Sequence, residues 1–288
     1  MIENITVLAA DIDMTLTFKG APLPQTVKDA FIILHDNGVK LGLATGRELT
    51  DALKNQGKTW GLPFEFDFVI GMNGGMLYDR EDDYSWSIPL MDEQEMKDIL
   101  TWMMPLIDKY KIAVNAEGGA NHSAMNINGE LLESAKRHGF IFEDKTGDVD
   151  GFCEKGAYKF LFRSEPEYAD EIRSRFLEKF GKDHQMVATF PGTVEAMHKG
   201  FDKGSGLRKY ADRHGIGRNE IIAFGDNEND NALLTVAGWG VALKNADEKT
   251  KEIADDITFD TCKDGGVGTY LKKYYIDPKG LKRKEGTK

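Results

Sequence analysis

Two acidic residues, separated by one position, follow the first apolar run of the chain. The run covers residues 6–10; Asp11 comes directly after it, with Asp13 two positions further on. A short continuous apolar run is typical of a strand buried on both faces of a parallel sheet, and such sheets bind ligands at the carboxyl ends of their strands. Two neighbouring carboxylates are costly to hold together unless a cation or a shared proton separates their charges. The pair is therefore a candidate catalytic or cation site, although turn chemistry alone also explains an Asp there.

A second polar group follows an apolar run in the last third of the chain. Residues 221–224 are apolar, and the stretch after them contains Asp226, Asn227, Asn229 and Asp230. Carboxylate and amide oxygens are the ligands that a hard cation such as Mg²⁺ prefers. Acids at this point would also complement the dipole of a following helix. Taken alone, the group leaves both interpretations open.

Two smaller features could hold an anion. Thr45 and Gly46 follow the apolar run 39–44, where a hydroxyl and backbone N–H groups can be presented to a phosphate. Lys203 lies just before a predicted helix. A single lysine in a chain with 37 basic residues is also explained as solvated surface.

The apolar periodicity predicts the elements that position these residues. In the first part of the chain, strands alternate with amphipathic helices over residues 6–10, 24–37, 39–44, 48–56 and 68–70. The alternation resumes, starting with a helix, over residues 205–214, 221–224, 229–236, 240–243 and 246–254. Strands and helices in that order predict an α/β fold with a parallel sheet.

The middle of the chain has strands and helices of its own but few candidate catalytic residues. A long amphipathic helix is marked by apolar residues between 96 and 107, and further elements are expected at 112–115, 157–163, 167–180 and 185–190. We therefore predict a catalytic core formed by residues 1–81 and 195–288, with a second domain, residues 82–194, inserted into it.

The composition argues against several classes of function. The 288 residues include 48 acidic and 37 basic ones, a formal charge of −11. Nucleic-acid binding needs a basic face, whereas a small phosphorylated substrate needs only local positive charge. The two cysteines, Cys153 and Cys262, are far apart and have no metal-ligand spacing. A disulfide framework is therefore not expected, which predicts a reducing compartment. Neither a signal peptide nor a membrane span is expected, so we predict a cytoplasmic protein that binds no membrane and works as a monomer or weak homo-oligomer.

Taken together, the four features resemble the four motifs of the haloacid dehalogenase superfamily in order and context. They are an acid pair after the first strand, Thr-Gly after the second, a Lys before a later helix, and Gly-Asp-x-x-Asn-Asp after a further strand. Within the superfamily, the chain is most similar to the Cof-type phosphatases, since residues 69–75, 240–243 and 264–267 also lie where that branch has characteristic segments. The resemblance implies a Rossmann-like parallel-sheet core with an inserted α/β cap domain of the C2 type.

The resemblance also implies a role for each acidic residue. Asp11 would be the nucleophile that forms an aspartyl-phosphate, and Asp13 would protonate the leaving alkoxide and then activate water. Mg²⁺ would be held by Asp11, the backbone carbonyl of Asp13 and Asp226, with Asn229 or Asp230 in support. The ion would offset repulsion between an anionic nucleophile and an anionic phosphate. The implied activity is hydrolysis of small phosphate monoesters, with sugar phosphates first and phosphorylated cofactors next.

Substrate binding is implied in the same way. Thr45, Gly46 and Lys203 would hold the phosphoryl oxygens, Lys203 as a point charge. Arg47, beside Thr45, and Asn73 are candidate substrate contacts. The inserted domain would act as a cap that excludes water and contacts the substrate.

Some residues depart from this pattern. Met14 lies beside the nucleophile, where family members commonly carry Gly, so the loop or the leaving-group side of the pocket could differ in shape. Apart from His122, which lies in a Gly-rich polar stretch of the inserted domain, the histidines, including His35 and His198, show no partner pattern. We expect surface or core roles for them.

Two other functions remain compatible with the sequence. A sugar phosphomutase would share the fold and the nucleophile, and its dependence on a bisphosphate activator would distinguish it from a phosphatase. A non-catalytic phospho-acceptor or binding module of the receiver type also uses Asp, Mg²⁺, Thr and Lys. Such a module is a single compact domain without an acid equivalent to Asp13, and turnover of a generic aryl phosphate would exclude it.

Overall fold

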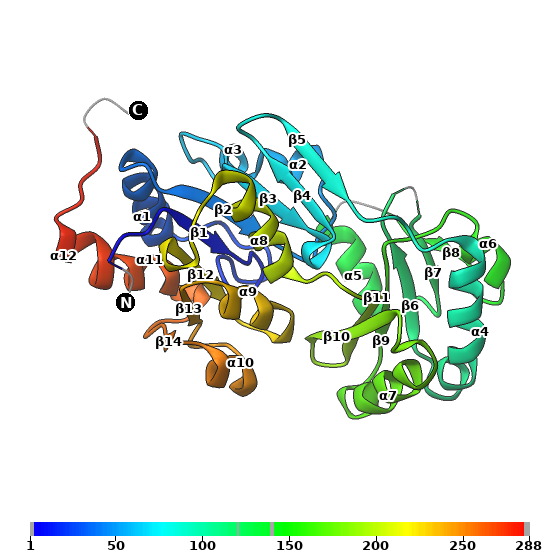
Figure 1. Ribbon diagram of the computed structural model, residues 1–288. Coiled ribbons are helices and arrows are strands. Elements are labelled where there is room, and N and C mark those ends of the chain that lie inside the picture. Colours follow the sequence, from blue (N-terminus) through cyan, green and yellow to red (C-terminus); the bar gives the residue numbers. More distant parts are fainter. Residues whose placement is uncertain (1–2, 120, 139–140, 285–288) are drawn as a thin grey trace. The chain divides into compact units, whose positions relative to one another are not determined.

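The computed structural model describes residues 3–119, 121–138 and 141–284 (Figure 1). The chain divides into two compact units. Residues 1–87 and 201–288 form the first unit, and residues 88–200 form the second. The second unit is therefore inserted between the two parts of the first.

The sheet of the first unit has, among the described residues, eight strands in the order β14-β13-β12-β1-β2-β3-β4-β5. The parallel strands are β1 (Val7–Ala10), β2 (Lys40–Ala44), β3 (Phe68–Gly71), β12 (Ile221–Gly225), β13 (Trp239–Ala242) and β14 (Asp256–Ile257). An antiparallel hairpin of β4 (Met76–Asp79) and β5 (Tyr84–Ser87) continues the sheet beyond β3. The predicted α/β fold with a parallel sheet is confirmed; the hairpin was not predicted.

Helices cover both faces of this sheet. One face carries α1 (Gln25–Asp36) and α11 (Gly266–Leu271), and the other carries α8 (Lys203–His214) and α9 (Asn231–Val236). The other helices of this unit are short: α2 (Asp51–Lys54), α3 (Gln56–Thr59), α10 (Glu248–Ile253) and α12 (Asp277–Lys279). The single helix predicted over 48–56 is thus two short helices that meet at Asn55, whose side chain donates a hydrogen bond to the backbone carbonyl of Asp51.

The side chains of β1 show why an unbroken apolar run is needed here. Successive residues of a strand point to opposite faces. Leu8 and Ala10 accordingly pack with α1 and α11, whereas Val7 and Ala9 pack with α8 and α9. All four side chains are fully buried, which leaves only the strand end available for a ligand.

The second unit has its own sheet, with strand order β10-β11-β9-β6-β7-β8. Its strands are β6 (Ala113–Glu117), β7 (Ser123–Met125), β8 (Glu143–Asp144), β9 (Lys159–Arg163), β10 (His184–Phe190) and β11 (Thr193–His198). Its helices are α4 (Glu93–Tyr110), α5 (Gly129–His138), α6 (Val149–Cys153) and α7 (Ala169–Phe180). Among the described residues, no helix combines the length and the apolar character that crossing a bilayer requires.

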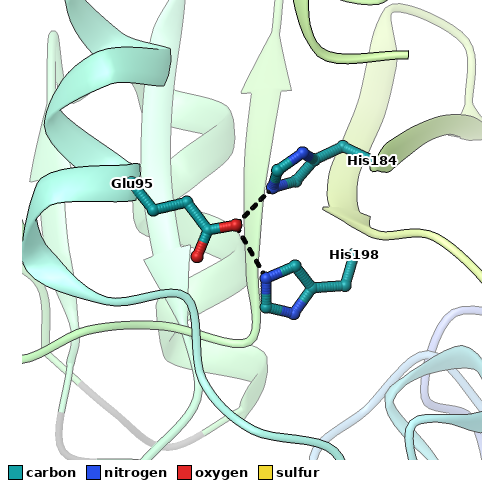
Figure 2. A group of neighbouring side chains, drawn as sticks. All are labelled: Glu95, His184 and His198. Carbon is teal, nitrogen blue, oxygen red and sulfur yellow. Dashed lines mark hydrogen bonds and ion pairs between the residues drawn. The ribbon is translucent and has the colours of Figure 1, made fainter. Parts of the chain in front are cut away.

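The β10–β11 hairpin ends beside the first turn of α4. His184 begins β10 and His198 ends β11, and both rings point toward Glu95 of α4 (Figure 2). The helices α4 and α7 share one hydrophobic cluster with the inner side chains of β6, β9, β10 and β11. This cluster gives the second unit a core of its own.

The chain passes from one unit to the other a few residues later than the predicted domain limits of 82 and 194. Residues 84–87 form β5, which pairs with β4 in the sheet of the first unit. Residues 193–198 form β11, which pairs with β9 and β10 in the sheet of the second unit. Strand pairing thus keeps residues 84–87 with the first sheet and residues 193–198 with the second, in agreement with compact units that divide at 87/88 and 200/201. The catalytic and cap roles of the two units stay predictions.

Candidate active site

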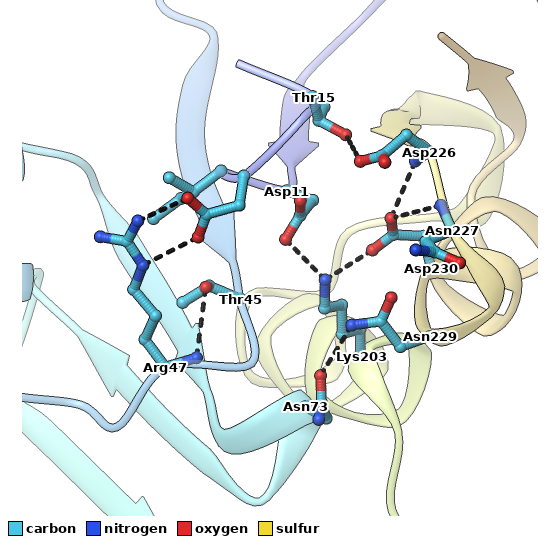
Figure 3. A network of polar contacts seen from close by, with 12 residues as sticks. Asp11, Thr15, Thr45, Arg47, Asn73, Lys203, Asp226, Asn227, Asn229 and Asp230 are labelled. Carbon is cyan, nitrogen blue, oxygen red and sulfur yellow. Dashed lines mark hydrogen bonds and ion pairs between the residues drawn. The ribbon is translucent and has the colours of Figure 1, made fainter. Parts of the chain in front are cut away.

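The order of the strands brings three loops together. Because β1 lies between β2 and β12, the residues that follow these strands meet at one edge of the sheet (Figure 3). Asp11 follows β1, Thr45 follows β2 and Asp226 follows β12, and all three are buried. The apolar runs predicted the strand ends, and the resemblance to the superfamily's motifs predicted that these residues form one site.

Lys203 lies at the first position of α8 and is fully buried. Its Nζ donates hydrogen bonds to Oδ1 of Asp11 and to Oδ1 of Asp230, each at 2.6 Å. Gly204 makes this approach possible, because a Cβ there would lie 2.3 Å from the backbone oxygen of Ala232. The absence of a side chain at this position lets α8 pack closely against α9 and brings the lysine to the strand ends.

The loop after β12 is organised by Asp230. Its Oδ2 accepts hydrogen bonds from the backbone N–H groups of Asp226 at 2.8 Å and Asn227 at 3.2 Å. Oδ1 of Asp226 accepts a 2.6 Å hydrogen bond from the hydroxyl of Thr15. Carboxylate oxygens of Asp11, Asp226 and Asp230 lie within 4.8 Å of one another. Lys203 contacts Asp11 and Asp230, and its single positive charge can balance only one of the three carboxylates in this group when all are ionised.

The excess of negative charge appears in the pKa values. Burial raises the pKa of Asp11 to about 7 against the attraction of Lys203, and the charges of Asp230 and Asp13 add to the rise. Burial likewise raises the pKa of Asp226 well above its usual range, with Asp230 and Asp11 contributing. Burial alone would lower the pKa of Lys203, but the two carboxylates outweigh it, so the lysine stays charged. A cation at this point would relieve the repulsion between the acids.

Asp13 lies outside this group and pairs with Arg47. The guanidinium donates from Nε to Oδ2 at 2.9 Å and from Nη2 to Oδ1 at 2.7 Å, a bidentate contact. Both side chains are about one third exposed, with values of 29% for Asp13 and 32% for Arg47. Arg47, expected as a substrate contact, thus holds the residue expected to transfer protons.

The remaining predicted residues line the same region. Asn73 is buried, and its Oδ1 accepts a hydrogen bond from the side chain of Asn229 at 3.0 Å. Gly46 lies against it, because a Cβ at this glycine would come within 3.1 Å of that Oδ1. The hydroxyl of Thr45 accepts a hydrogen bond from the backbone N–H of Arg47 at 3.3 Å. The structure therefore brings every predicted site residue to one edge of the sheet.

The loop after β1 explains a departure in the sequence and adds one residue to the site. Met14 has a φ of 66°, in the left-handed region that glycine adopts at least cost. Its carbonyl accepts a 2.8 Å hydrogen bond from Asn245, which also accepts one from the backbone N–H of Cys262. Asn245 was not predicted. Its position shortly after β13, at the end of another strand of the sheet, is the sequence feature that could have identified it as a site residue.

A parallel α/β sheet that gathers three carboxylates, a buried lysine and a hydroxyl at its strand ends defines a site for phosphoryl-group chemistry. The chain belongs to the haloacid dehalogenase-like hydrolases, whose family model matches residues 8–271. Membership of this superfamily, predicted from the four motifs, is confirmed.

Curated relatives of the chain are phosphatases. It is 25% identical to the 5-amino-6-(5-phospho-D-ribitylamino)uracil phosphatase YitU of Bacillus subtilis, over 93% of this chain and 97% of that protein. It is 36% identical to a putative phosphatase of Haemophilus influenzae, over 68% of this chain and 72% of that protein. The predicted enzyme class, a phosphoric monoester hydrolase, is confirmed.

Solved structures share the fold over nearly the whole chain. TM0651 from Thermotoga maritima is 27% identical, with a TM-score of 0.73 over 93% of this chain and 97% of that one. The subclass IIB sugar phosphatase BT4131 is 20% identical, with a TM-score of 0.77 over 94% of this chain and 99% of that one. The second likeness concerns the fold alone.

Proposed function

We propose that the protein is a Mg²⁺-dependent phosphatase that hydrolyses small phosphate monoesters through an aspartyl-phosphate on Asp11. The observation that carries the proposal is the contact of Lys203 with both Asp11 and Asp230, beside Asp226. A buried lysine next to a buried carboxylate at a strand end supplies the two things phosphoryl transfer needs, a nucleophile and positive charge for the phosphoryl oxygens.

The residues present fit a hard divalent cation. Oxygen atoms of Asp11, Asp226 and Asp230 lie within 4.8 Å of one another and carry two more negative charges than Lys203 neutralises. Carboxylate-rich sets of this kind are those that Mg²⁺ uses. Asp11, Asp226 and the backbone carbonyl of Asp13 would hold the ion, with Asp230 or Asn229 in support. When bound, Mg²⁺ neutralises charge on the phosphate and lets an anionic nucleophile approach.

The chain's own residues then account for two displacements. A carboxylate oxygen of Asp11 attacks phosphorus as the bond from phosphorus to the leaving oxygen breaks, and Asp13 gives that oxygen a proton. Water next attacks the aspartyl-phosphate, Asp13 takes a proton from it, and phosphate and free Asp11 result. Lys203, Thr45 and the backbone of Gly46 hold the phosphoryl oxygens during both steps.

Arg47 has a positioning role in this scheme. Its guanidinium engages both oxygens of Asp13, and each oxygen keeps a second lone-pair site through which Asp13 can exchange a proton, first with the leaving group and later with water. The bidentate contact fixes the plane of the carboxylate between these events.

We infer that the substrate is a phosphate ester of a sugar or polyol, or a phosphorylated cofactor. Support comes from relatives that align along nearly their whole length: YitU and YcsE of Bacillus subtilis are both 5-amino-6-(5-phospho-D-ribitylamino)uracil phosphatases. That compound is a phosphorylated ribityl chain on a pyrimidine, and we propose it as the first substrate to test. The second unit would serve as the cap. We also retain cytoplasmic location as part of the proposal.

The test is phosphate release from a panel of monoesters by the purified chain, with Mg²⁺ and with a chelator. The panel should include sugar phosphates, the ribitylaminouracil phosphate, pyridoxal phosphate and flavin mononucleotide. The proposal predicts turnover that requires Mg²⁺. Activity only with a bisphosphate activator would indicate a mutase instead, and a stable phosphoprotein without turnover would indicate a phospho-acceptor.

A further inference from the structure

A second cluster of metal-ligating side chains lies wholly within the inserted unit. The Nε2 atoms of His184 and His198 lie 2.6 and 2.8 Å from the same oxygen, Oε1 of Glu95 (Figure 2). One ligand atom from each residue lies within 4.8 Å of the other two. The phosphatase scheme uses none of the three residues. An inference from this Glu95–His184–His198 cluster is therefore independent of the proposed function.

Three elements hold the cluster in place. His184 and His198 are direct partners across the β10–β11 hairpin, so their side chains project from the same face at close range. Their ring centroids are 5.2 Å apart. Glu95 completes a capping box at the start of α4, where its Oε2 accepts a hydrogen bond from the backbone N–H of Asp92 at 3.3 Å. The cap holds one oxygen of Glu95, and the other faces the two histidines.

Packing fixes one histidine and leaves the cluster accessible. The ring of His184 is buried and packs nearly at right angles to the rings of Phe176 and Phe180, with centroids 6.1 and 5.9 Å away. The side chains of His198 and Glu95 are 23% and 27% exposed. The partly exposed side chains of His198 and Glu95 give an ion and a water molecule a route to the cluster from solvent, while packing holds the ring of His184 in place.

The ligand set indicates which ion would bind. Two imidazole nitrogens and one carboxylate oxygen form a set that zinc enzymes use, with the fourth position open to water. Imidazole suits Zn²⁺ and neighbouring transition metals, whereas Mg²⁺ and Ca²⁺ favour oxygen ligands. Ligand atoms around tetrahedral Zn²⁺ are about 3.3 Å apart, so Oε1 of Glu95 would have to move outward by roughly half an ångström. Rotation of a partly exposed carboxylate allows this.

We propose that the Glu95–His184–His198 cluster binds one divalent transition-metal ion of the Zn²⁺ class through the two Nε2 atoms and the Glu95 carboxylate, with water completing the coordination. The ion ties the first turn of α4 to both ends of the β10–β11 hairpin. Because these elements are far apart in sequence, the bound ion stabilises the fold of the inserted unit.

One feature limits the affinity. A histidine that binds a metal through Nε2 carries its proton on Nδ1, and zinc ligands usually donate this N–H to an acceptor. The Nδ1 atom of His184 is buried and has no hydrogen-bond partner among the described residues. Loss of such an outer partner weakens metal binding about 10–100-fold, so we expect weaker binding than at a fully supported zinc site.

The competing explanation is a hydrogen-bonded trio without an ion, in which both imidazoles donate to one carboxylate oxygen. Two conservative substitutions separate the explanations. His198→Gln keeps a donor to Glu95 but removes a metal ligand. Glu95→Gln keeps an acceptor for both imidazoles and for the capping box but removes the negative charge that favours a cation.

The experiment is a Zn²⁺ titration of the full chain against a chromophoric chelator, with excess Mg²⁺ present to occupy the acidic site of the first unit. Wild type should take up one Zn²⁺ at this cluster. His198→Gln should lower the affinity for Zn²⁺ by more than about 100-fold, because losing a direct ligand costs at least as much as losing an outer partner. Glu95→Gln should lower this affinity too. His35→Gln is the matched control: it removes an imidazole that stacks on Phe64 in the first unit, and it should bind Zn²⁺ like wild type.

Two readouts make the outcome decisive. Zn²⁺ should raise the melting temperature of wild type and of His35→Gln but not of His198→Gln, whose fold circular dichroism would verify. Asp226→Asn should keep the Zn²⁺ uptake, because Asp226 belongs to the other cluster. The proposal is overturned if wild type takes up no Zn²⁺ at micromolar concentration, if His198→Gln binds as tightly as wild type, or if Asp226→Asn alone abolishes uptake.

Discussion

Replacing Lys203 with methionine removes the one positive charge at the centre of the acidic cluster while keeping an unbranched side chain of similar length. In the native protein its Nζ lies 2.6 Å from carboxylate oxygens of both Asp11 and Asp230 and is fully buried. Lys203→Met would leave these acids and Asp226 buried together with no cationic side chain at their centre.

The size of the effect follows from this geometry. At an effective dielectric constant of 20, two unit charges 2.6 Å apart attract by about 6 kcal/mol. Much of that is offset by the cost of burying the lysine, and breaking a buried ion pair by removing one partner typically costs about 3–5 kcal/mol. We therefore expect Lys203→Met to lower the free energy of unfolding by about 3–5 kcal/mol without a divalent cation. Mg²⁺ should restore part of this loss. The ion should also stabilise the variant more than wild type, because the variant has one more carboxylate whose charge is not neutralised by Lys203.

Urea unfolding with and without Mg²⁺ measures these quantities, and turnover of an aryl phosphate measures the catalytic loss. Turnover should fall by roughly 10²–10³-fold, the usual effect of removing one charge-stabilising group from a phosphoryl or acyl site. Lys249→Met is the control, because Lys249 is exposed on α10, and its stability should stay within about 0.5 kcal/mol of wild type. A Lys203→Met protein as stable as wild type, with an unchanged response to Mg²⁺, would refute this balance of charges in the acidic cluster.

Three further substitutions test other parts of the first unit. Arg47→Ala should lower kcat about 10–100-fold by freeing Asp13, with less than about 1 kcal/mol lost in stability because both side chains are partly exposed; unchanged kcat would rule out the positioning role. Burial would raise the pKa of Asp79, but its hydrogen bonds, led by the one from His214, lower the pKa below its usual value. The ionised Asp79 therefore stabilises the folded protein above about pH 4, and this stabilisation is lost as the pH falls through the lowered pKa. Asp79→Asn should accordingly cost about 2 kcal/mol at neutral pH and much less in acid, and a pH-independent difference in denaturant unfolding would contradict this. Met14→Gly should keep turnover and leave the protein equally stable or up to about 1 kcal/mol more stable, whereas a clear loss of stability would show that the methionine side chain is needed.

The meeting of the site residues could be predicted because apolar runs mark buried strands, and parallel strands end at one edge of a sheet. Asp11, Thr45 and Asp226 were expected at strand ends in this way, and the resemblance to the superfamily's motifs joined them into one site. The contact between Asp13 and Arg47 could not, because it depends on how two loops fold over the strand ends. Nothing in sequence spacing says whether an arginine beside a phosphate site faces the substrate or a neighbouring acid.

The limits between the two units were harder to predict than the units themselves. The hairpin β4–β5 carries polar residues on its edge strand, and an alternating pattern such as that of β5 gives no sign of which sheet it joins. Pairing with β4 decides it. The placement of β11 was equally hard to predict, since its pairing with the preceding strand β10 and with β9 shows only in the structure.

The Glu95–His184–His198 cluster shows the strongest limit. His198 has no local partner pattern, and the 89 positions that separate Glu95 from His184 make their contact invisible in a single sequence. Only the register of the β10–β11 hairpin and the packing of α4 beside it bring the three side chains together.

The central claim is that Asp11 attacks phosphorus, and the most direct measurement is the rate of phosphate release by Asp11→Asn with Mg²⁺ present. The substitution keeps the shape of the side chain and leaves Lys203 buried beside it, so circular dichroism should report a folded protein. We predict that release of phosphate falls by more than about a thousandfold relative to wild type, as expected when a nucleophile is removed. A folded Asp11→Asn protein that keeps most of its Mg²⁺-dependent activity would contradict the account.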